Sequence, residues 1–214
     1  MTGLRLKLDL HIHSTHSIDS HNTIDTIVSR IQEMGFNGYA LADHDTIEGL
    51  KEAKEKSGDI VLIPALEVTA KGAHILALDP RELVEPDLSM KETVERIHEQ
   101  GSLAVLAHPY GLPRSWININ QVEEAGFDAI EVANSAQIPY EYISSLNQKL
   151  ADKLELPVTG GSDSHIPETI GRAYTFVQSD SKELDDVLKA IKLGRTSIGG
   201  SNTRITEWFS KHFR

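Results

Sequence analysis

The chain has 214 residues, no cysteine and a formal net charge of −11. The absence of cysteine excludes disulfides and thiolate metal ligands, and the acidic balance argues against a broad basic groove for duplex DNA. No apolar run approaches the roughly 20 residues that span a bilayer, and the N-terminus lacks a signal-peptide pattern. We therefore expect a cytoplasmic protein with no membrane partner. An anionic substrate is compatible with this charge, because bound cations are not included in it.

The first segment of the chain predicts a strand followed by a helix. Residues 4–13 alternate strictly between an apolar face and a face that presents His11 and His13. Two imidazoles on the same side of a strand can reach one metal ion. Apolar residues at helical spacing then predict a helix that starts at a cap at residues 22–23 and ends at Gly35.

Further strands and helices alternate along the rest of the chain. The predicted strands cover residues 39–42, 60–63, 74–78, 103–107, 129–132, 157–159 and 173–177, and Pro64 is expected to end the second of these. The predicted helices include one that ends near residue 56 and others at 89–100, which starts with a capping box, 140–154 and 181–193. This alternation predicts βαβ units with a parallel sheet, and about seven units in this length predict a small, distorted (βα) barrel of the α/β class.

Ionisable side chains recur where predicted strands meet loops: His11, His13, Asp19, His44, Glu67, His74, His108, Asp163 and His165. Burying this many ionisable groups together would be very costly without cations to pair with them. Solvated loops and core histidines explain any one of these residues, but they explain nine together poorly. His74 lies at the start of its strand, so a core histidine remains the alternative there. Imidazole and carboxylate donors favour Zn, Mn, Fe or Ni.

Five motifs together resemble the PHP (polymerase and histidinol phosphatase) family: residues 9–14, 42–46, 64–68, 107–109 and 161–165. They occur in the family's order, and the match spans residues 4 to about 200. The resemblance implies a distorted seven-stranded (βα), TIM-like barrel that holds two or three divalent ions (Mn, Zn or Fe) and hydrolyses phosphoesters. We expect residues 1–200 to form this domain and residues 201–214 to form a helical tail.

The family pattern, transferred residue by residue, suggests three metal positions. The first would use His11, His13, Glu67 and Asp163, the second Glu67 as a bridge with His74 and His108, and the third Asp19, His44 and His165. Some family members have His where this chain has Asp19. The resemblance also implies catalytic roles for Glu67, Asp163 and His165. Our hypothesis is that a metal-bridging hydroxide attacks phosphorus in line, while the third metal or an acid near His16 stabilises the leaving alkoxide.

Two further residues are candidates for substrate binding. Arg172 lies shortly after the last motif and could grip a phosphate, and His16 lies in the polar loop after the first strand. A solvated side chain is the alternative for both. Asp43 and Asp45 flank the histidine of the second motif and could orient imidazoles, although helix capping explains Asp45 equally well.

The motifs indicate the type of reaction more clearly than they indicate the substrate. Asp19 and residues 43–46 most resemble the stand-alone branch of the family, which acts on nucleoside phosphates or short oligonucleotides. Those relatives often carry an inserted subdomain that is absent here, because only about 40 residues separate Glu67 from His108. We expect a small phosphorylated substrate, such as a nucleotide or a short single-stranded oligonucleotide. Histidinol-phosphate phosphatase is the alternative, and an amidohydrolase or a non-catalytic PHP-like subunit is the alternative from another class.

Overall fold

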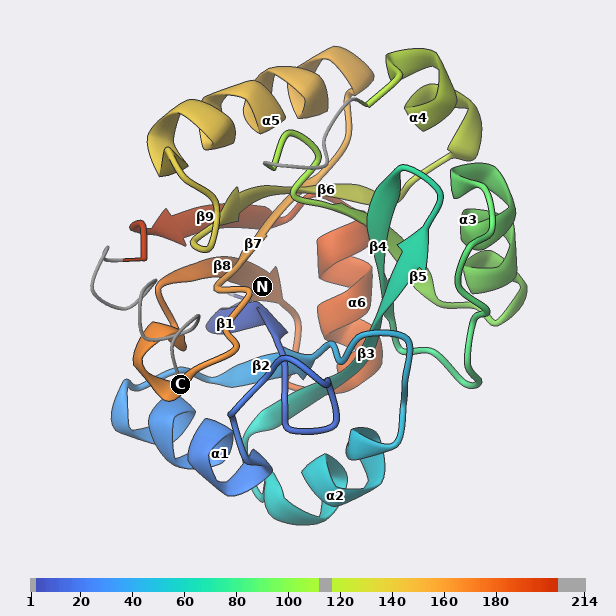
Figure 1. Cartoon of the computed structure of the whole chain (residues 1–214). Helices are drawn as coiled ribbons and strands as arrows, with labels where there is room; N and C mark the ends of the chain where they lie inside the picture. The colour runs from blue at the N-terminus through green and yellow to red at the C-terminus, as the bar shows by residue number, and fades with distance from the viewer. Residues whose placement is uncertain (1–2, 112–116, 204–214) are drawn as a thin grey trace.

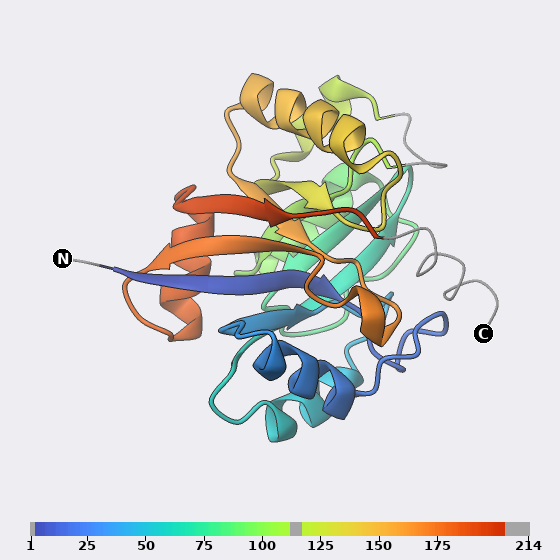
Figure 2. The ribbon, with the colours of Figure 1, turned by 90° about the vertical axis from the view of Figure 1, so that its left-hand side faces the viewer.

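Nine strands form one mixed sheet that curls into a nearly closed barrel (Figures 1 and 2). The computed structural model describes residues 3–111 and 117–203. The strands are β1 (Leu4–Ile12), β2 (Gly38–Leu41), β3 (Val61–Ala70), β4 (Ala73–Leu78), β5 (Leu103–Ala107), β6 (Ala129–Asn134), β7 (Val158–Gly161), β8 (Ala173–Ser179) and β9 (Thr196–Gly200). Their order across the sheet is β7-β6-β5-β4-β3-β2-β1-β8-β9.

Helices surround this sheet and cover one end of the barrel. They are α1 (Ile24–Glu33), α2 (Gly49–Lys56), α3 (Met90–Glu99), α4 (Ile119–Ala125), α5 (Tyr140–Leu154), α6 (Leu184–Lys192) and the short 3-10 helix η1 (Pro167–Thr169). In Figure 2, α6 lies at the end of the barrel from which β1 enters, and the loop after β1 lies at the opposite end. Among the described residues, no helix is both long and apolar enough to cross a membrane.

The α/β barrel is confirmed, but the prediction of seven parallel strands is wrong. β4 runs antiparallel to both β3 and β5, and β8 runs antiparallel to both β1 and β9. The connection from β3 to β4 contains only Lys71 and Gly72, and Gly72 has a φ of 83°. A connection this short permits only an antiparallel hairpin, because a parallel partner needs a crossover of a dozen or more residues.

Pro64 does not end the third strand as predicted. Residues 61–64 of β3 pair with β2, and residues 65–70 pair with β4 on the other side. Pro64 pairs with Leu41, the last residue of β2, and its carbonyl accepts a 2.7 Å hydrogen bond from the Asp79 N–H. Proline cannot donate a backbone hydrogen bond, but at Pro64 the strand changes its partner from β2 to β4. The missing N–H therefore does not interrupt β3.

The alternation predicted for β1 holds only as far as Leu10. The pairing register between β1 and β2 shifts between Asp9 and Ile12. Leu10 belongs to the apolar cluster that includes α6 and alternate residues of seven strands, whereas Ile12 packs in a separate cluster with α1. A bulge changes which face a side chain occupies. Here it allows His11 to share the barrel interior with the leucines that precede it.

The barrel closes where β7 meets β1 and β8. The Asp163 N–H donates to the His11 carbonyl at 2.8 Å, and the His13 N–H donates to the Ser164 carbonyl at 3.0 Å. Between β7 and β8, the Gly160 N–H donates to Thr175 Oγ1 at 2.7 Å. This closure positions the Asp163–His165 loop beside the end of β1.

Most predicted helices are confirmed, including the Thr23 cap of α1 and the Ser89–Glu92 capping box of α3. Helix α4, helix η1 and strand β9 were not predicted. Of the predicted helical tail, residues 201–203 have no regular structure, and residues 204–214 lie outside the described part of the chain.

Candidate metal centre

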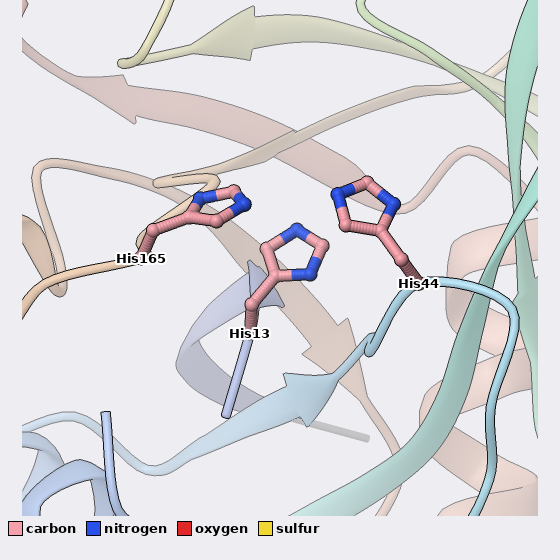
Figure 3. Close-up of side chains that lie close together, drawn as sticks. All are labelled: His13, His44 and His165. Atoms are coloured by element: carbon pink, nitrogen blue, oxygen red, sulfur yellow. The ribbon is translucent and has the colours of Figure 1, made fainter. Parts of the chain in front are cut away.

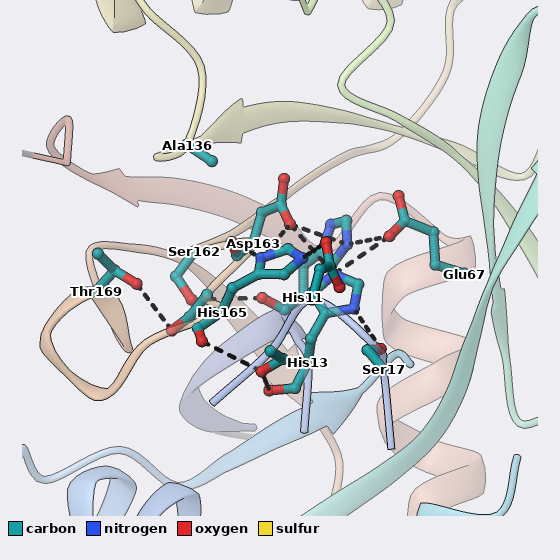
Figure 4. Close-up of polar contacts among 12 residues, drawn as sticks. His11, His13, Ser17, Glu67, Ala136, Ser162, Asp163, His165 and Thr169 are labelled. Atoms are coloured by element: carbon teal, nitrogen blue, oxygen red, sulfur yellow. Dashed lines mark hydrogen bonds and ion pairs between the residues drawn. The ribbon is translucent and has the colours of Figure 1, made fainter. Parts of the chain in front are cut away.

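The nine predicted ligands converge at the end of the barrel opposite α6. Seven separate segments supply them: β1 and the residue after it, the β1–α1 loop, β3, β4, and the residues that follow β2, β5 and β7. Figure 4 shows part of this cluster, with the carboxylates of Glu67 and Asp163 directed toward the imidazoles. The predicted convergence is therefore observed, and it includes His74, for which a core position was the alternative.

Glu67 lies at the centre of the cluster and is fully buried. Its Oε2 lies 3.1 Å from His11 Nε2, 3.2 Å from His13 Nε2 and 3.2 Å from His44 Nδ1. Its Oε1 lies 2.9 Å from His74 Nδ1 and 3.2 Å from His108 Nε2. One carboxylate thus contacts five imidazoles, with its two oxygens serving separate groups of rings. This is the arrangement that a bridging ligand requires.

Asp163 and Asp19 extend the cluster on the side of β7. Asp163 Oδ1 lies 3.2 Å from His13 Nε2 and 3.5 Å from His165 Nδ1. Asp19 Oδ2 lies 3.0 Å from His165 Nε2 and 3.9 Å from His44 Nε2. Asp163 has a φ of 51°, a left-handed backbone that is uncommon for a residue other than glycine. Such strain is typical of functional sites.

The His13 ring lies between those of His44 and His165 (Figure 3). The ring centroids are 4.4 Å apart for His13 and His44, and 4.2 Å apart for His13 and His165. His13 Nε2 is buried and has no hydrogen-bond partner in the structure, although carboxylate oxygens lie 3.2 Å away. A buried nitrogen without a partner is costly in a folded protein, and a metal ion would satisfy it.

Within the described residues, three groups of side chains have ligand atoms that all lie within 4.8 Å of one another: His11, His13, Glu67 and Asp163; His44, Glu67 and His74; and His13, His44 and His165. The first group is identical to the first predicted metal position. The second has His44 where the prediction has His108, and the third has His13 where the prediction has Asp19. The residues present therefore fit divalent metals, while the division of ligands among positions remains a prediction.

Neighbouring charges within the cluster shift the pKa values of several of its side chains. Burial opposes a charge on His11, but Glu67, Glu131 and Asp163 outweigh it and hold its pKa well above the usual value. Burial likewise opposes a charge on His13, but the Asp163 and Glu67 carboxylates raise its pKa to about 9. Burial favours the neutral form of Glu67, yet the surrounding imidazoles hold its pKa well below the usual value. Without metal, protonated imidazoles thus balance the negative charges of the ionised carboxylates.

The pKa of His44 shifts in the opposite direction to those of His11 and His13. Burial lowers its pKa to about 4, and neighbouring carboxylates offset this only in part. It is therefore neutral at pH 7, which is the form that ligates a metal.

Asp43 supports the loop that follows β1. Its carboxylate accepts hydrogen bonds from the Ser14 N–H at 2.6 Å and from Ser17 Oγ at 3.0 Å. Ser17 Oγ lies 3.3 Å from His13 Nδ1 and accepts from the His44 N–H at 2.9 Å. Asp43 is therefore connected through Ser17 to the His13 ring and to the His44 backbone, and its role in orienting imidazoles remains a prediction.

Sequence reasoning missed the buried Glu131 on β6 and its neighbour Asn134. Glu131 Oε1 lies 3.0 Å from His11 Nδ1, and Asn134 Nδ2 donates to Asp163 Oδ2 at 3.2 Å. A charged residue in the otherwise apolar strand Ala129–Asn134 is the signal that could have revealed Glu131.

The two predicted substrate-binding residues are not brought into the cluster. His16 is partly exposed and lies 3.4 Å from Glu52. Arg172 lines a second cavity with Arg30 and Glu168. Their proposed contact with substrate remains a prediction.

A cavity of about 440 Å³ opens above the cluster. Predicted ligands form one wall: Asp19, His44, Glu67, His74, His108, Asp163 and His165. The described part of the other wall is neutral and mostly small or apolar: Thr69, Ala70, Gly72, Ala73, Ala107, Pro109, Gly111, Ile117 and Gln137. A ligand can thus place one end among the imidazoles and carboxylates and the other against an uncharged surface.

Comparison with known protein families and sequences gives three findings. A family described as PHP-associated matches residues 146–196. An uncharacterized protein of Methanocaldococcus jannaschii is 31% identical over 142 residues, which cover 61% of this chain and 82% of the relative. A protein of Syntrophotalea carbinolica named a probable phosphatase is 24% identical over 206 residues, which cover 78% of this chain and 83% of the relative.

Solved structures share the fold. A two-domain protein of Bacteroides vulgatus that contains a predicted PHP-like metal-dependent phosphoesterase superposes with a TM-score of 0.79 at 20% identity, covering 99% of this chain and 70% of that one. The lesion-specific endonuclease Q of Pyrococcus furiosus superposes with a TM-score of 0.74 at 20% identity, covering 91% of this chain and 58% of that one.

Proposed function

The chain belongs to the PHP family, and from this premise we propose that it is a metal-dependent hydrolase of phosphoesters. The observation that supports this most directly is the position of Glu67, whose fully buried carboxylate contacts five imidazoles. A probable phosphatase among the sequence relatives and metal-dependent phosphoesterases and endonucleases among the structural ones support the same chemistry.

The nine converging side chains would hold two or three divalent ions, with Glu67 shared between positions. Divalent ions in such a site polarise the phosphoryl group, stabilise developing negative charge and lower the pKa of water. Manganese, zinc and iron all suit imidazole and carboxylate donors. The three carboxylates of the ligand set, Asp19, Glu67 and Asp163, leave an excess of positive charge on three such ions, and this excess favours an anionic substrate.

The catalytic roles that we assign follow from where each side chain lies. Glu67 and Asp163 line the cavity and contact the fully buried imidazoles of His11 and His13 behind it. His165 lies at the cavity wall with its Nε2 3.0 Å from Asp19 Oδ2, so with only two ions bound and the third position empty this pair can hold a proton beside the substrate.

The cavity favours a small substrate with a neutral organic group. Its volume of about 440 Å³ suits a phosphomonoester, a nucleotide or the end of a short single-stranded oligonucleotide. The apolar wall that includes Ala70, Pro109 and Ile117 can pack against a sugar or a base. In the described lining, every carboxylate belongs to the predicted ligand set. None is left to pair with the cationic amine of histidinol phosphate, which makes that substrate the weaker alternative.

The expectation that duplex DNA is excluded has no support from the fold. Endonuclease Q has the same fold and has been solved in complex with a 27-mer duplex substrate. The net charge of −11 remains the argument for a smaller substrate, since a protein that grips duplex phosphates normally presents many Lys and Arg side chains.

A screen of phosphorylated compounds against the protein reconstituted separately with Mn, Zn and Fe tests the proposal. We expect release of inorganic phosphate or nucleotide from at least one class, and loss of that activity in Asp163→Ala. Full turnover by Asp163→Ala with unchanged metal content would contradict the proposed site. An N-acyl amide included in the panel tests the amidohydrolase alternative, which predicts amide cleavage without phosphoester turnover.

A further inference from the structure

Glu131 is a buried carboxylate that belongs to none of the predicted metal positions. It lies on β6 with 1% of its surface exposed, and it does not line the cavity above the cluster. A buried carboxylate without a cationic partner is costly, so its contacts indicate what it stabilises. All of the contacts described below are with the cluster or with the residues that hold it.

The two oxygens of Glu131 serve different parts of the cluster. Oε1 lies 3.0 Å from His11 Nδ1, the ring nitrogen opposite the one that faces Glu67. Oε2 accepts hydrogen bonds from the His108 N–H at 3.0 Å and from Asn134 Nδ2 at 2.9 Å. Glu131 thus connects a residue of the first predicted metal position with a residue of the second.

The contact with His11 determines which nitrogen is free to ligate. A carboxylate only accepts hydrogen bonds, so His11 must carry a proton on Nδ1 to bond with it. The lone pair of the neutral ring is then on Nε2, which lies 3.1 Å from Glu67 Oε2 and faces the cluster. A carboxylate in this position also makes the imidazole a stronger metal ligand.

The contact with His108 acts on the backbone. His108 has a φ of 28°, a backbone conformation that residues other than glycine rarely adopt. The hydrogen bond from its N–H to Glu131 Oε2 helps hold this strained residue where its ring Nε2 lies 3.2 Å from Glu67 Oε1. Asn134 extends the same network to Asp163 Oδ2.

We propose that Glu131 is a positioning residue for metal binding, which fixes the tautomer of His11 and the backbone of His108 so that two metal positions form together. This inference rests on the metal-dependent function proposed above. It assigns to one side chain the alignment of ligands that come from three separate strands of the barrel.

The substitution Glu131→Gln tests the role because it preserves shape. Glutamine has one acceptor oxygen where the network uses two, so either His11 Nδ1 or the pair of donors at His108 and Asn134 faces an NH2 group. We expect zinc affinity to fall about 10- to 100-fold, as for other residues that support metal ligands. Competition with a chromophoric chelator measures the affinity. Where the NH2 group faces His11, nitrogen-15 NMR of the zinc-loaded protein should show that the proton of this ring has moved from Nδ1 to Nε2.

Asp128→Asn is the matched control. Asp128 Oδ2 also lies between an imidazole and a backbone donor, 2.8 Å from His98 Nε2 and 2.9 Å from the Ala104 N–H, but His98 is exposed and neither belongs to the cluster. We expect this variant to bind zinc within about 2-fold of the unmodified protein, since no metal ligand depends on Asp128. A wild-type zinc affinity and an unchanged His11 tautomer in Glu131→Gln would overturn the proposal.

Asn134→Ala provides a second variant if Glu131→Gln does not fold, as judged by circular dichroism. It removes the donor shared by Glu131 and Asp163 and should weaken zinc binding several-fold, so an unchanged affinity again counts against the network. If the unmodified chain binds zinc but hydrolyses no phosphoester, the proposed function fails while the role of Glu131 is still tested. If the unmodified chain binds no metal, both proposals fail.

Discussion

His74 and Glu67 meet diagonally across the β3–β4 hairpin, with His74 Nδ1 2.9 Å from Glu67 Oε1. Glu67 is directly opposite Leu76, and His74 is directly opposite Thr69, so the two side chains are diagonal neighbours on one face. A histidine at the start of a strand reaches the central carboxylate because this strand runs against its neighbours and starts at the end of the barrel where they finish.

This relationship predicts that His74→Ala selectively weakens metal binding. His74 is partly exposed, so its removal should leave the free energy of unfolding of the metal-free protein within about 1 kcal/mol of the original value. Metal affinity should fall about 10-fold or more because a predicted ligand of the metal that Glu67 also binds is lost. Elemental analysis after dialysis measures the bound metal. His98→Ala, which removes a histidine on the outer surface, is the control and should retain the full metal content.

Metal binding should release protons, and it should weaken as the pH falls. Below about pH 9, His13 of the metal-free protein carries a proton that a metal must displace, and the pKa of His11 is also well above its usual value. Affinity should therefore increase as the pH rises toward about 9, because the proton on His13 competes less and less with the metal. Calorimetric titration at pH 7.5 in buffers of different ionisation enthalpy should show release of at least one proton. Binding without any proton release would contradict these protonation states.

Removal of metal should lower the melting temperature. A ligand at 100 times its Kd stabilises the folded state by about 2.7 kcal/mol, which corresponds to roughly 5–10 °C for a domain of this size. Differential scanning calorimetry with and without a chelator measures the shift, and added zinc should reverse it. In Glu67→Gln, which alters the carboxylate shared by the metal positions, the chelator should cause a much smaller shift. An equal shift in that variant would place the stabilising metal elsewhere.

Gly161→Ala should disrupt the closure of the barrel. A Cβ at Gly161 would overlap with the Cβ and the backbone nitrogen of His11. We expect destabilisation of about 2–4 kcal/mol in urea denaturation, together with weaker metal binding because His11 must move. Gly58→Ala is the control: Gly58 has a φ of 56° but open space around it, so backbone strain should cost only about 1 kcal/mol and leave metal binding unchanged. Similar effects of the two substitutions would show that the Gly161–His11 contact is unimportant.

Sequence patterns predicted much of this fold because they reflect local physics. The capping box at Ser89 and Glu92 and the Thr23 cap satisfy helix ends within a few residues, and both are observed. Patterns failed where a neighbour far along the chain decides the outcome. Pro64 stays within β3 because β2 ends beside it, and β9 forms by pairing with β8 although its residues have little apolar character.

Most of the candidate ligands could be named from the sequence because they follow the predicted end of a strand, and barrel strands bring such residues to one end. Which ligands share a metal could not be derived in this way, since that depends on distances between side chains from separate strands. Glu131 was missed for the same reason: only the curled sheet lets a side chain from β6 reach the far nitrogen of His11 on β1.

The sequence by itself therefore determined the donor chemistry and most of the elements that carry it, because these depend on residue type and local spacing. The tertiary structure decided the antiparallel strands, the turn of His11 into the barrel interior and the sharing of Glu67 among five imidazoles. These features arise only when the sheet curls, since this brings charged groups from distant segments within about 3 Å of one another around a fully buried carboxylate.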